Sequence, residues 1–193
     1  MNPVTSTSSV RSLLECYIRA KDQNQPELIF DCFAAAAELT FEIATDAIDF
    51  PRSVTGAPAI AKTLVTDFGE RFDRCRTYYV CTGPEMHAAG VCTMPWLVAM
   101  RQKDNEALRL GKGTYRWRIA RMPDGPDRIV GLHIAIERMD VIDDPGAVML
   151  QTLQELLTYP WLPVPELAQR IDSFLSMYPE PAFTTAFRHP SRH

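Results

Sequence analysis

The sequence predicts an α+β protein in which a mainly antiparallel sheet lies between helices at both ends of the chain. Three observations support this fold class. Apolar residues recur at helical spacing in most of the first 72 residues, four β-rich runs occupy residues 74–142, and helical spacing returns from residue 144 onward. We therefore expect one unit over residues 1–142 and a helical C-terminal extension with a tail over residues 143–193.

Three helices are expected before the sheet. The first follows the Ser-rich start, with Ser8 or Ser9 as N-cap. The second is short and begins at Pro26 within "NQPELIFDCFAAAA", and the third opens at Gly56 and Pro58. Their apolar stripes are Val10, Leu13, Leu14, Tyr17, Ile18 and Lys21, then Leu28, Ile29, Cys32 and Phe33, then Ile60, Leu64, Val65, Phe68 and Phe72.

The strands are recognised by alternation. In "ELTFEIA", Leu39, Phe41 and Ile43 alternate with polar residues, which is the period of a half-buried strand. The polar segments "GPEMH", "QKDNE" and "PDGPD" then separate the later runs and are suitable hairpin connections. The four runs are "RCRTYYVCT", "AAGVCTMPWLVAMR", "ALRLGKGTYRWRIAR" and "RIVGLHIAIERMDVI".

Two amphipathic helices are expected in the C-terminal extension. Asp144 is a suitable cap for the first, with Pro145 in its first turn. A proline-rich link leads to the second, and residues 179–193 are predicted to be loose coil. The apolar faces are Met149, Leu150, Leu153, Leu156 and Leu157 in the first, and Leu167, Ile171, Phe174 and Leu175 in the second.

Composition limits the function classes. The 193 residues are 46% hydrophobic and 23% charged, which suits a globular domain with an appendage. The net charge of −4 argues against nucleic acid as a partner. No apolar run approaches the ~18 residues that span a bilayer, and the start lacks the pattern of a signal peptide. We expect a cytoplasmic protein that does not bind membranes.

The cysteines are expected to be reduced thiols of the core. Their number is odd, and they are scattered among apolar neighbours rather than spaced like a disulfide framework. They are Cys16, Cys32, Cys75, Cys81 and Cys92.

The order of these elements resembles the nuclear transport factor 2-like superfamily, in particular its polyketide-cyclase (SnoaL-like) branch. The resemblance rests on "FAAAAELTFE", "GAPAIAKTL" and "GTYRWRIARMPDGPDRIVGLHIAIE" and covers roughly residues 8 to 142. It implies a cone-shaped, curved sheet wrapped around three N-terminal helices, with a pocket between them, and frequent homodimers. Members use this pocket as isomerases, dehydratases, cyclases, hydrolases or non-catalytic binders, so the fold does not select a function.

The last hairpin can be read by its two faces. If "PDGPD" closes it, one face carries the apolar pairs and the other carries Arg116, Arg118 and His133. We expect the apolar face to line the pocket and the mixed face to meet solvent or a partner subunit, with a pocket wall and nucleic acid as weaker alternatives. The predicted pairs are Ile119–Val130, Trp117–Leu132 and Tyr115–Ile134 on one face, and Arg118–Gly131, Arg116–His133, Thr114–Ala135 and Lys112–Glu137 on the other.

The resemblance suggests two catalytic candidates, Tyr17 and His133. Members of the superfamily often carry a histidine in the corresponding strand, and isomerase-like members can present a phenol to a developing oxyanion from the first helix. The alternatives are a half-exposed strand histidine and a core tyrosine. Steroid-isomerase members place the aspartate that acts as general base where this chain has Phe41. This difference argues against proton abstraction by the steroid-isomerase mechanism. Candidate ligand-binding residues are Tyr79, Trp96, Tyr115 and Trp117.

No cofactor or metal is expected. "GKGT" lacks the leading glycine and the final Ser or Thr of a phosphate loop, and the four histidines lack metal-ligand spacing. The leading hypothesis is a protein that binds a small apolar or cyclic molecule, as a lyase, isomerase or cyclase. The alternative is a non-catalytic association or ligand-binding module that forms a homodimer through the outer sheet face and the C-terminal helices. A third is that this extension closes the pocket as a lid, through Trp161 and Phe174.

Overall fold

The computed structural model describes residues 7–123 and 125–191. The helices are α1 (Thr7–Asp22), α2 (Ile29–Cys32), α3 (Ala57–Ala61), α4 (Asp67–Arg71), α5 (Val148–Leu156) and α6 (Val164–Met177). The strands are β1 (Phe33–Ile43), β2 (Ser53–Thr55), β3 (Phe72–Tyr79), β4 (Met86–His87), β5 (Val91–Gln102), β6 (Leu108–Arg121) and β7 (Asp127–Ile142). Shorter turns are η1 (Pro26–Leu28), the π-helical η2 (Lys62–Thr66), η3 (Ala88–Gly90), η4 (Pro145–Ala147) and η5 (Ala182–Phe187).

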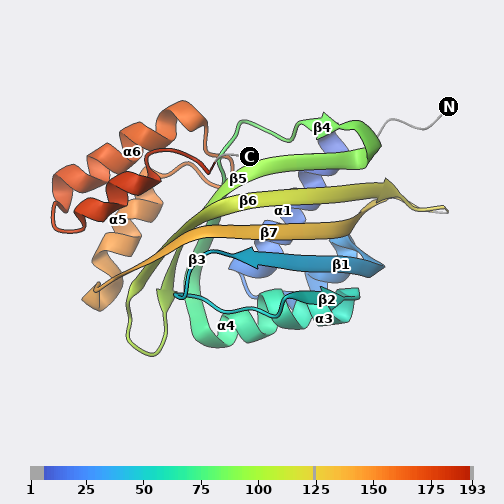
Figure 1. The fold of residues 1–193 in the computed structure, drawn as a ribbon, viewed down its shortest axis with the longest axis horizontal. Helices are drawn as coiled ribbons and strands as arrows, with labels where there is room; N and C mark the ends of the chain where they lie inside the picture. The colour runs from blue at the N-terminus through green and yellow to red at the C-terminus, as the bar shows by residue number, and fades with distance from the viewer. Residues whose placement is uncertain (1–6, 124, 192–193) are drawn as a thin grey trace.

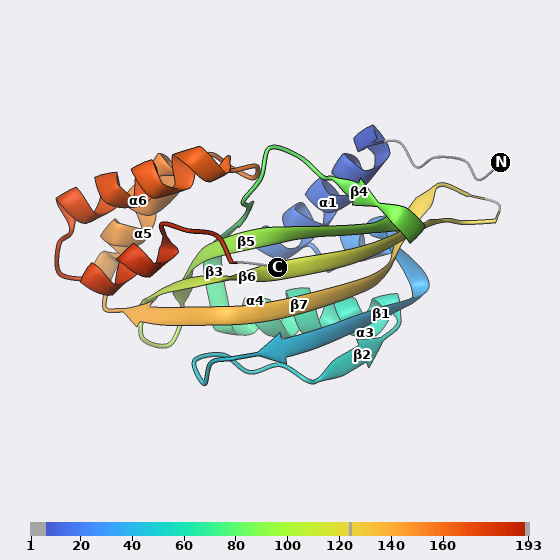
Figure 2. The same ribbon diagram turned by 45° about the horizontal axis from the view of Figure 1, so that its top comes forward.

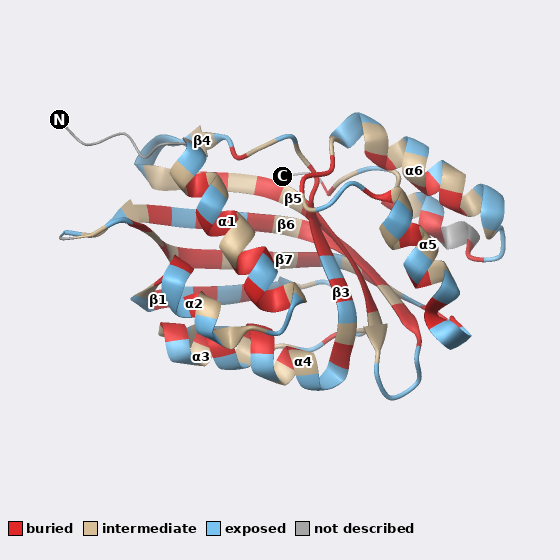
Figure 3. Cartoon of the chain, turned by 180° about the vertical axis from the view of Figure 1, so that it is seen from behind, coloured by how far each residue is buried: buried red, intermediate tan, exposed pale blue. Residues whose placement is uncertain are grey.

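The strands form one curved sheet in the order β2-β1-β7-β6-β5-β3, with β4 paired to β5. The pairing of β1 with β7 is parallel, and the other pairings are antiparallel. The sheet bends around α1 to α4, which cover one of its faces (Figures 1 and 3). The predicted α+β class is therefore confirmed. Among the described residues, no helix is long and apolar enough to cross a membrane.

Two hydrophobic clusters lie on opposite faces of this sheet. The inner cluster joins α1 to α4 to alternate residues of the strands, such as Leu39 and Trp117. The outer cluster joins α5, α6 and η5 to residues of the opposite parity, such as Leu97 and Leu110. Figure 2 shows α5 and α6 gathered at one end of the sheet. Residues 97–100 are buried without alternation because both faces are covered there.

The register of the last hairpin agrees with the sequence except at two bulges. The predicted pairs from Arg118–Gly131 to Thr114–Ala135 are confirmed. Register shifts pair Ile119 with Ile129 and Lys112 with Arg138. The predicted partners, Val130 and Glu137, were therefore wrong. The second bulge, between Lys112 and Gly113, leaves no room for a side chain at Gly113. A Cβ there would lie 1.9 Å from Ala135 O and 2.7 Å from Trp96.

Two predicted segments have a different structure. Residues 34–37 continue β1 instead of the second helix, although alanine favours helices, and the register of β1 against β7 shifts across them, between Phe33 and Glu38. Residues 179–191 are not loose coil: Phe187 is fully buried in the outer cluster, and Lys112 Nζ donates to the carbonyls of Ala186 (3.0 Å) and His189 (3.3 Å). Ser8 and Ser9 lie inside α1 and do not cap it.

Candidate functional site

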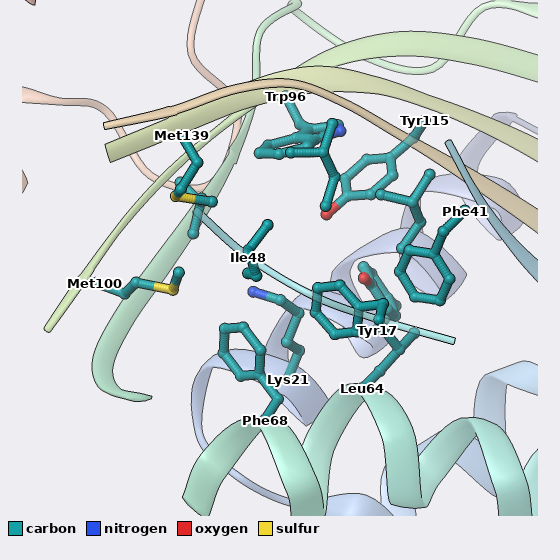
Figure 4. A pocket seen from close by; sticks show the side chains of 14 residues that line it. Tyr17, Lys21, Phe41, Ile48, Leu64, Phe68, Trp96, Met100, Tyr115 and Met139 are labelled. Carbon is teal, nitrogen blue, oxygen red and sulfur yellow. The ribbon is translucent and has the colours of Figure 1, made fainter. Parts of the chain in front are cut away.

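A cavity of about 40 Å³ lies inside the curve of the sheet. Its wall is almost entirely apolar, and the polar groups are Lys21 and the hydroxyls of Tyr17 and Tyr115, with the indole of Trp96 stacked on Tyr115 (Figure 4). We call this cavity the cone pocket. Its lining residues are Tyr17, Lys21, Phe41, Ile48, Phe50, Leu64, Phe68, Trp96, Val98, Met100, Tyr115, Ile134, Ile136 and Met139.

Alternation in β5 and β6 brings the aromatic wall together. Residues of one parity on each strand face inward, so Trp96 and Tyr115 stack with ring centroids 5.5 Å apart. Tyr17 projects from α1 edge-on to Tyr115 at 6.0 Å. Burial, followed by the neighbouring Tyr115, raises the pKa of the Tyr17 phenol well above its usual value, so this phenol is neutral.

Two polar atoms of this wall have unused hydrogen-bonding capacity. In the part of the chain that the structure describes, the hydroxyl of Tyr17 and Nε1 of Trp96 are buried without a hydrogen-bond partner. A buried polar group without a partner is costly, and an indole N–H can only donate. Figure 4 shows the hydroxyls of Tyr17 and Tyr115 directed into the space between α1 and the sheet. An acceptor atom of a bound molecule would therefore find donors here.

Lys21 enters the cone pocket one helical turn after Tyr17. Its Nζ lies 2.8 Å from Thr77 Oγ1, 3.3 Å from Cys75 Sγ and 3.4 Å from Asp22 Oδ1, and 4.5 Å from the centre of the Phe68 ring. Burial opposes its charge, but its contacts with the Cys75 sulfur and the charge of Asp22 outweigh burial and raise the pKa of Lys21. The pocket therefore carries a permanent cation.

Asp22 faces away from the cone pocket. Its carboxylate accepts hydrogen bonds from the backbone N–H (2.7 Å) and Oγ1 (2.9 Å) of Thr77, and from the Tyr159 hydroxyl (3.1 Å) of the C-terminal extension. Burial, followed by the charge of Asp22, raises the pKa of the Cys75 thiol to about 12. Cys75 is therefore a neutral thiol and supplies no nucleophile to the pocket.

The loop of residues 44–52 closes the open side of the cone pocket. It places Ile48 and Phe50 in the wall, and the Phe50 ring stacks on Phe41 at 4.6 Å. Arg109 donates to Ala47 O at 2.9 Å, and Arg71 donates to Asp49 O at 3.3 Å. Burial and the charge of Arg71 lower the pKa of Arg109. Side-chain bonds to its carbonyls, one aromatic stack and backbone hydrogen bonds at its two ends attach this loop.

The six predicted site residues do not form one site. Tyr17, Trp96 and Tyr115 line the cone pocket. Trp117 and Tyr79 belong to the aromatic layer beside it, Trp117 with its ring 5.0 Å from Tyr17 and Tyr79 with its hydroxyl donating to the Leu14 carbonyl at 2.9 Å. His133 lies on the outer face of the sheet, so it cannot act with Tyr17 on one bound molecule.

His133 belongs instead to a groove of about 350 Å³ on the outer face, lined by Glu38, Thr40, Arg116, Arg118, Gly131, Leu132 and His133. A hydrogen bond of 2.8 Å joins Thr40 Oγ1 and His133 Nδ1, and Arg118 donates to Glu38 at 2.6 Å. We call this surface the outer groove. The expected outward position of Arg116, Arg118 and His133 agrees with it.

Sequence reasoning missed the charged part of the cone pocket. Lys21 was recognised only as a member of the helical stripe, although a cation on an otherwise apolar stripe is a signal for a buried partner. Asp22 and Thr77 are 55 residues apart, and nothing in either segment indicates that they meet. Phe174 lies in the outer cluster, so the predicted lid role for this residue was wrong.

No protein-family model matches the chain, and no curated protein matches its sequence. Solved structures do match its three-dimensional arrangement. A nuclear transport factor 2 (NTF2-like) superfamily protein from Salmonella enterica serovar Typhimurium strain LT2 gives a TM-score of 0.58 at 19% identity, over 68% of this chain and 91% of that chain. The chain has the NTF2-like fold.

Other NTF2-like matches have different described activities. The hexachlorocyclohexane dehydrochlorinase LinA-type3 from Novosphingobium barchaimii LL02 has a TM-score of 0.56 at 14% identity, over 70% of this chain and 88% of that one. A ketosteroid isomerase-like protein from Erwinia carotovora atroseptica has a TM-score of 0.53 at 7% identity, over 68% of this chain and 96% of that one. The predicted resemblance is confirmed for the fold. At these identities the NTF2-like fold alone is shared.

Proposed function

We propose that the NTF2-like unit, residues 1–142, binds a small, flat, mainly apolar molecule with one acceptor oxygen in the cone pocket. The observation that carries this proposal is the Tyr17 hydroxyl, which is buried in the pocket wall without a hydrogen-bond partner in the described chain. A carbonyl or carboxylate oxygen beside Tyr17 and Tyr115 would supply that partner. The Lys21 cation favours a carboxylate.

The size of the cone pocket restricts how such a molecule enters. About 40 Å³ accommodates a few water molecules, which is too little for a six-membered ring. Met100 and Met139 in the wall are unbranched and can adopt other rotamers. The 44–52 loop would also move outward with Ile48 and Phe50. We therefore expect binding to be slow and to require displacement of this loop.

Binding is better supported than catalysis. Among the described residues that line the pocket there is neither a carboxylate nor an imidazole to abstract a proton. Tyr17 and Lys21 could stabilise an oxyanion, but a lyase, isomerase or cyclase would need its base from the substrate or from solvent. In this proposal the protein is cytoplasmic, and the described part of the C-terminal extension, residues 143–191, covers part of the outer face of the sheet.

Calorimetric titration of the full chain with benzoate, benzamide and toluene tests the proposal. These probes have similar shapes and differ in the acceptor oxygen and its charge. We expect benzoate to bind most tightly and toluene most weakly, and Tyr17→Phe to weaken benzoate about tenfold without changing toluene. Equal affinities for the three probes, equal benzoate affinity in Tyr17→Phe, or no binding at millimolar concentration would overturn it.

We also propose that the outer groove pairs two copies of the chain. Arg118 and Glu38 lie side by side in it, so the same surface of a second copy is complementary in charge. The C-terminal helices were expected to share this interface, but their apolar faces are packed on the sheet of the same chain. Sedimentation equilibrium should show a dimer that Arg118→Glu weakens and the exposed control Arg74→Glu does not. A monomer, or equal effects of both variants, would oppose this proposal.

A further inference from the structure

Cys16 and Cys32 lie close together behind the cone pocket. Cys16 is on α1 directly before Tyr17, and Cys32 is the last residue of α2. The sulfurs share one neighbour, the carbonyl oxygen of Leu28, at 3.5 Å from Cys16 Sγ and 3.3 Å from Cys32 Sγ. Cys16 is partly exposed and Cys32 is fully buried. An accessible thiol, Cys16, therefore lies next to a buried one, Cys32.

The surroundings of the two thiols make them unequal. The neighbouring Cys32 thiol lowers the pKa of Cys16 to about 6, and Arg19 lowers it further against burial and the charge of Asp31. The same contact and burial raise the pKa of Cys32, with Arg128 opposing. The Cys16 thiol therefore loses its proton more readily than the Cys32 thiol. Reactive cysteines of redox sensors combine these properties with a nearby resolving thiol.

The pKa values of the other three cysteines are raised rather than lowered. Burial is the main cause that raises the pKa of Cys75 to about 12, and of Cys81 and Cys92 to about 11. Cys81 is partly exposed like Cys16, so it is a control whose thiol is also accessible but protonated. Accessibility alone would make Cys16 and Cys81 react alike, whereas the Cys16–Cys32 pairing makes Cys16 react first.

We propose that Cys16 and Cys32 form a peroxide-sensitive dithiol in which Cys16 is oxidised first and Cys32 resolves it. The Cys16 thiolate attacks hydrogen peroxide, the O–O bond breaks, and a sulfenic acid forms as hydroxide leaves; the sulfur loses two electrons to the peroxide. The Cys32 sulfur then attacks the Cys16 sulfur, an S–S bond forms, and the sulfenic oxygen leaves as water with the thiol proton. A thiol reductant restores both thiols.

The disulfide would affect the wall of the cone pocket. Cys16 precedes Tyr17 and Cys32 precedes Phe33, and the rings of Tyr17 and Phe33 are 6.2 Å apart. A covalent bond between α1 and α2 would therefore fix the helix that carries Tyr17 and Lys21. It would also close a short chain loop and restrict the unfolded chain, so the oxidised protein should melt at a higher temperature.

The experiment treats the folded full chain with hydrogen peroxide near stoichiometry and maps its peptides by mass spectrometry. We expect a peptide pair linked through Cys16 and Cys32, reversed by dithiothreitol. In Cys32→Ser, a dimedone adduct should accumulate on Cys16 instead. The control Cys81→Ser should oxidise like the wild type. Oxidation of Cys81 or Cys92 before Cys16, or a different linked pair, would overturn the proposal.

A second measurement needs no variant and so does not depend on the folding of one. Iodoacetamide alkylates the thiolate form of a cysteine, so its rate follows the thiolate fraction. On the wild-type chain at pH 7, Cys16 should be modified at least tenfold faster than Cys81, and its rate should change little from pH 7 to pH 8.5. Equal rates at the two cysteines, or a Cys16 rate that still rises steeply above pH 8, would contradict the assigned roles.

Discussion

Lys21 Nζ and Asp22 Oδ1 lie 3.4 Å apart at the end of α1, with their side chains only 8% and 3% exposed. Removing one charge of a buried pair leaves the other without compensation. We expect Lys21→Met to lower the free energy of unfolding by about 3 kcal/mol. The double variant Lys21→Met/Asp22→Asn should lose less than the two single losses combined, by at least 1 kcal/mol. Urea denaturation of the four proteins measures this coupling, and strict additivity would show that the pair contributes no coupling.

Tyr17 and Tyr79 offer a matched comparison of buried phenols. The Tyr79 hydroxyl donates to Leu14 O, whereas the Tyr17 hydroxyl has no partner among the described residues. Tyr79→Phe should lower the unfolding free energy by about 1 kcal/mol, and Tyr17→Phe should leave it unchanged or raise it by up to ~1 kcal/mol. Chemical denaturation without ligand compares the two. A loss in Tyr17→Phe as large as that in Tyr79→Phe would show that its hydroxyl is satisfied.

Asp73 should give the stability a pH dependence. A paired hydrogen bond from Arg101, at 2.8 and 2.7 Å, holds the pKa of Asp73 below its usual range. Because this pKa is lower in the folded state, the stabilisation is complete above the unfolded value near pH 4 and is lost as the pH falls through the folded value.

Asp73→Asn should therefore cost about 1 kcal/mol at pH 7 and progressively less below about pH 4. Asp67→Asn is the control, since Asp67 pairs with the exposed Lys62 and should change stability little at either pH. Denaturant titrations at pH 7 and pH 3 give the comparison. A cost of Asp73→Asn that is the same at both values would contradict the assignment.

Phe187 tests whether the end of the chain belongs to the fold. It is fully buried in the outer cluster, while Phe30 is 52% exposed. Phe187→Ala should cost about 3–5 kcal/mol, and Phe30→Ala less than ~0.5 kcal/mol. Thermal unfolding followed by circular dichroism measures both. A small loss at Phe187 would mean that the outer cluster is stable without η5.

The sequence predicted those features that depend on local periodicity. Alternation in β6 and β7 was enough to pair Trp117 with Leu132 and Arg116 with His133. Bulges were not predictable in the same way, because they depend on a close approach such as that of Gly113 to Ala135, which has no periodic signature.

The sequence likewise did not predict which distant elements pack against each other. The amphipathic faces of α5 and α6 were visible, but not that they cover the outer side of β5 and β6. The cone pocket was predicted in its aromatic part, through Tyr17, Trp96 and Tyr115. Its closing loop was not, because Ile48 and Phe50 lie in an Asp- and Pro-containing segment without helical or strand spacing.

The parallel pairing of β1 with β7 determines when the fold can form. Thr40 and His133 are bonded across 93 residues of chain, so β1 has its central neighbour only after almost the entire sheet has been made. Closing so long a segment costs entropy before any contact compensates for it, and domains with such non-local pairing refold on a scale of about milliseconds to seconds. During synthesis, the edge of β1 that pairs with β7 therefore remains without its strand partner until β7 has left the ribosome.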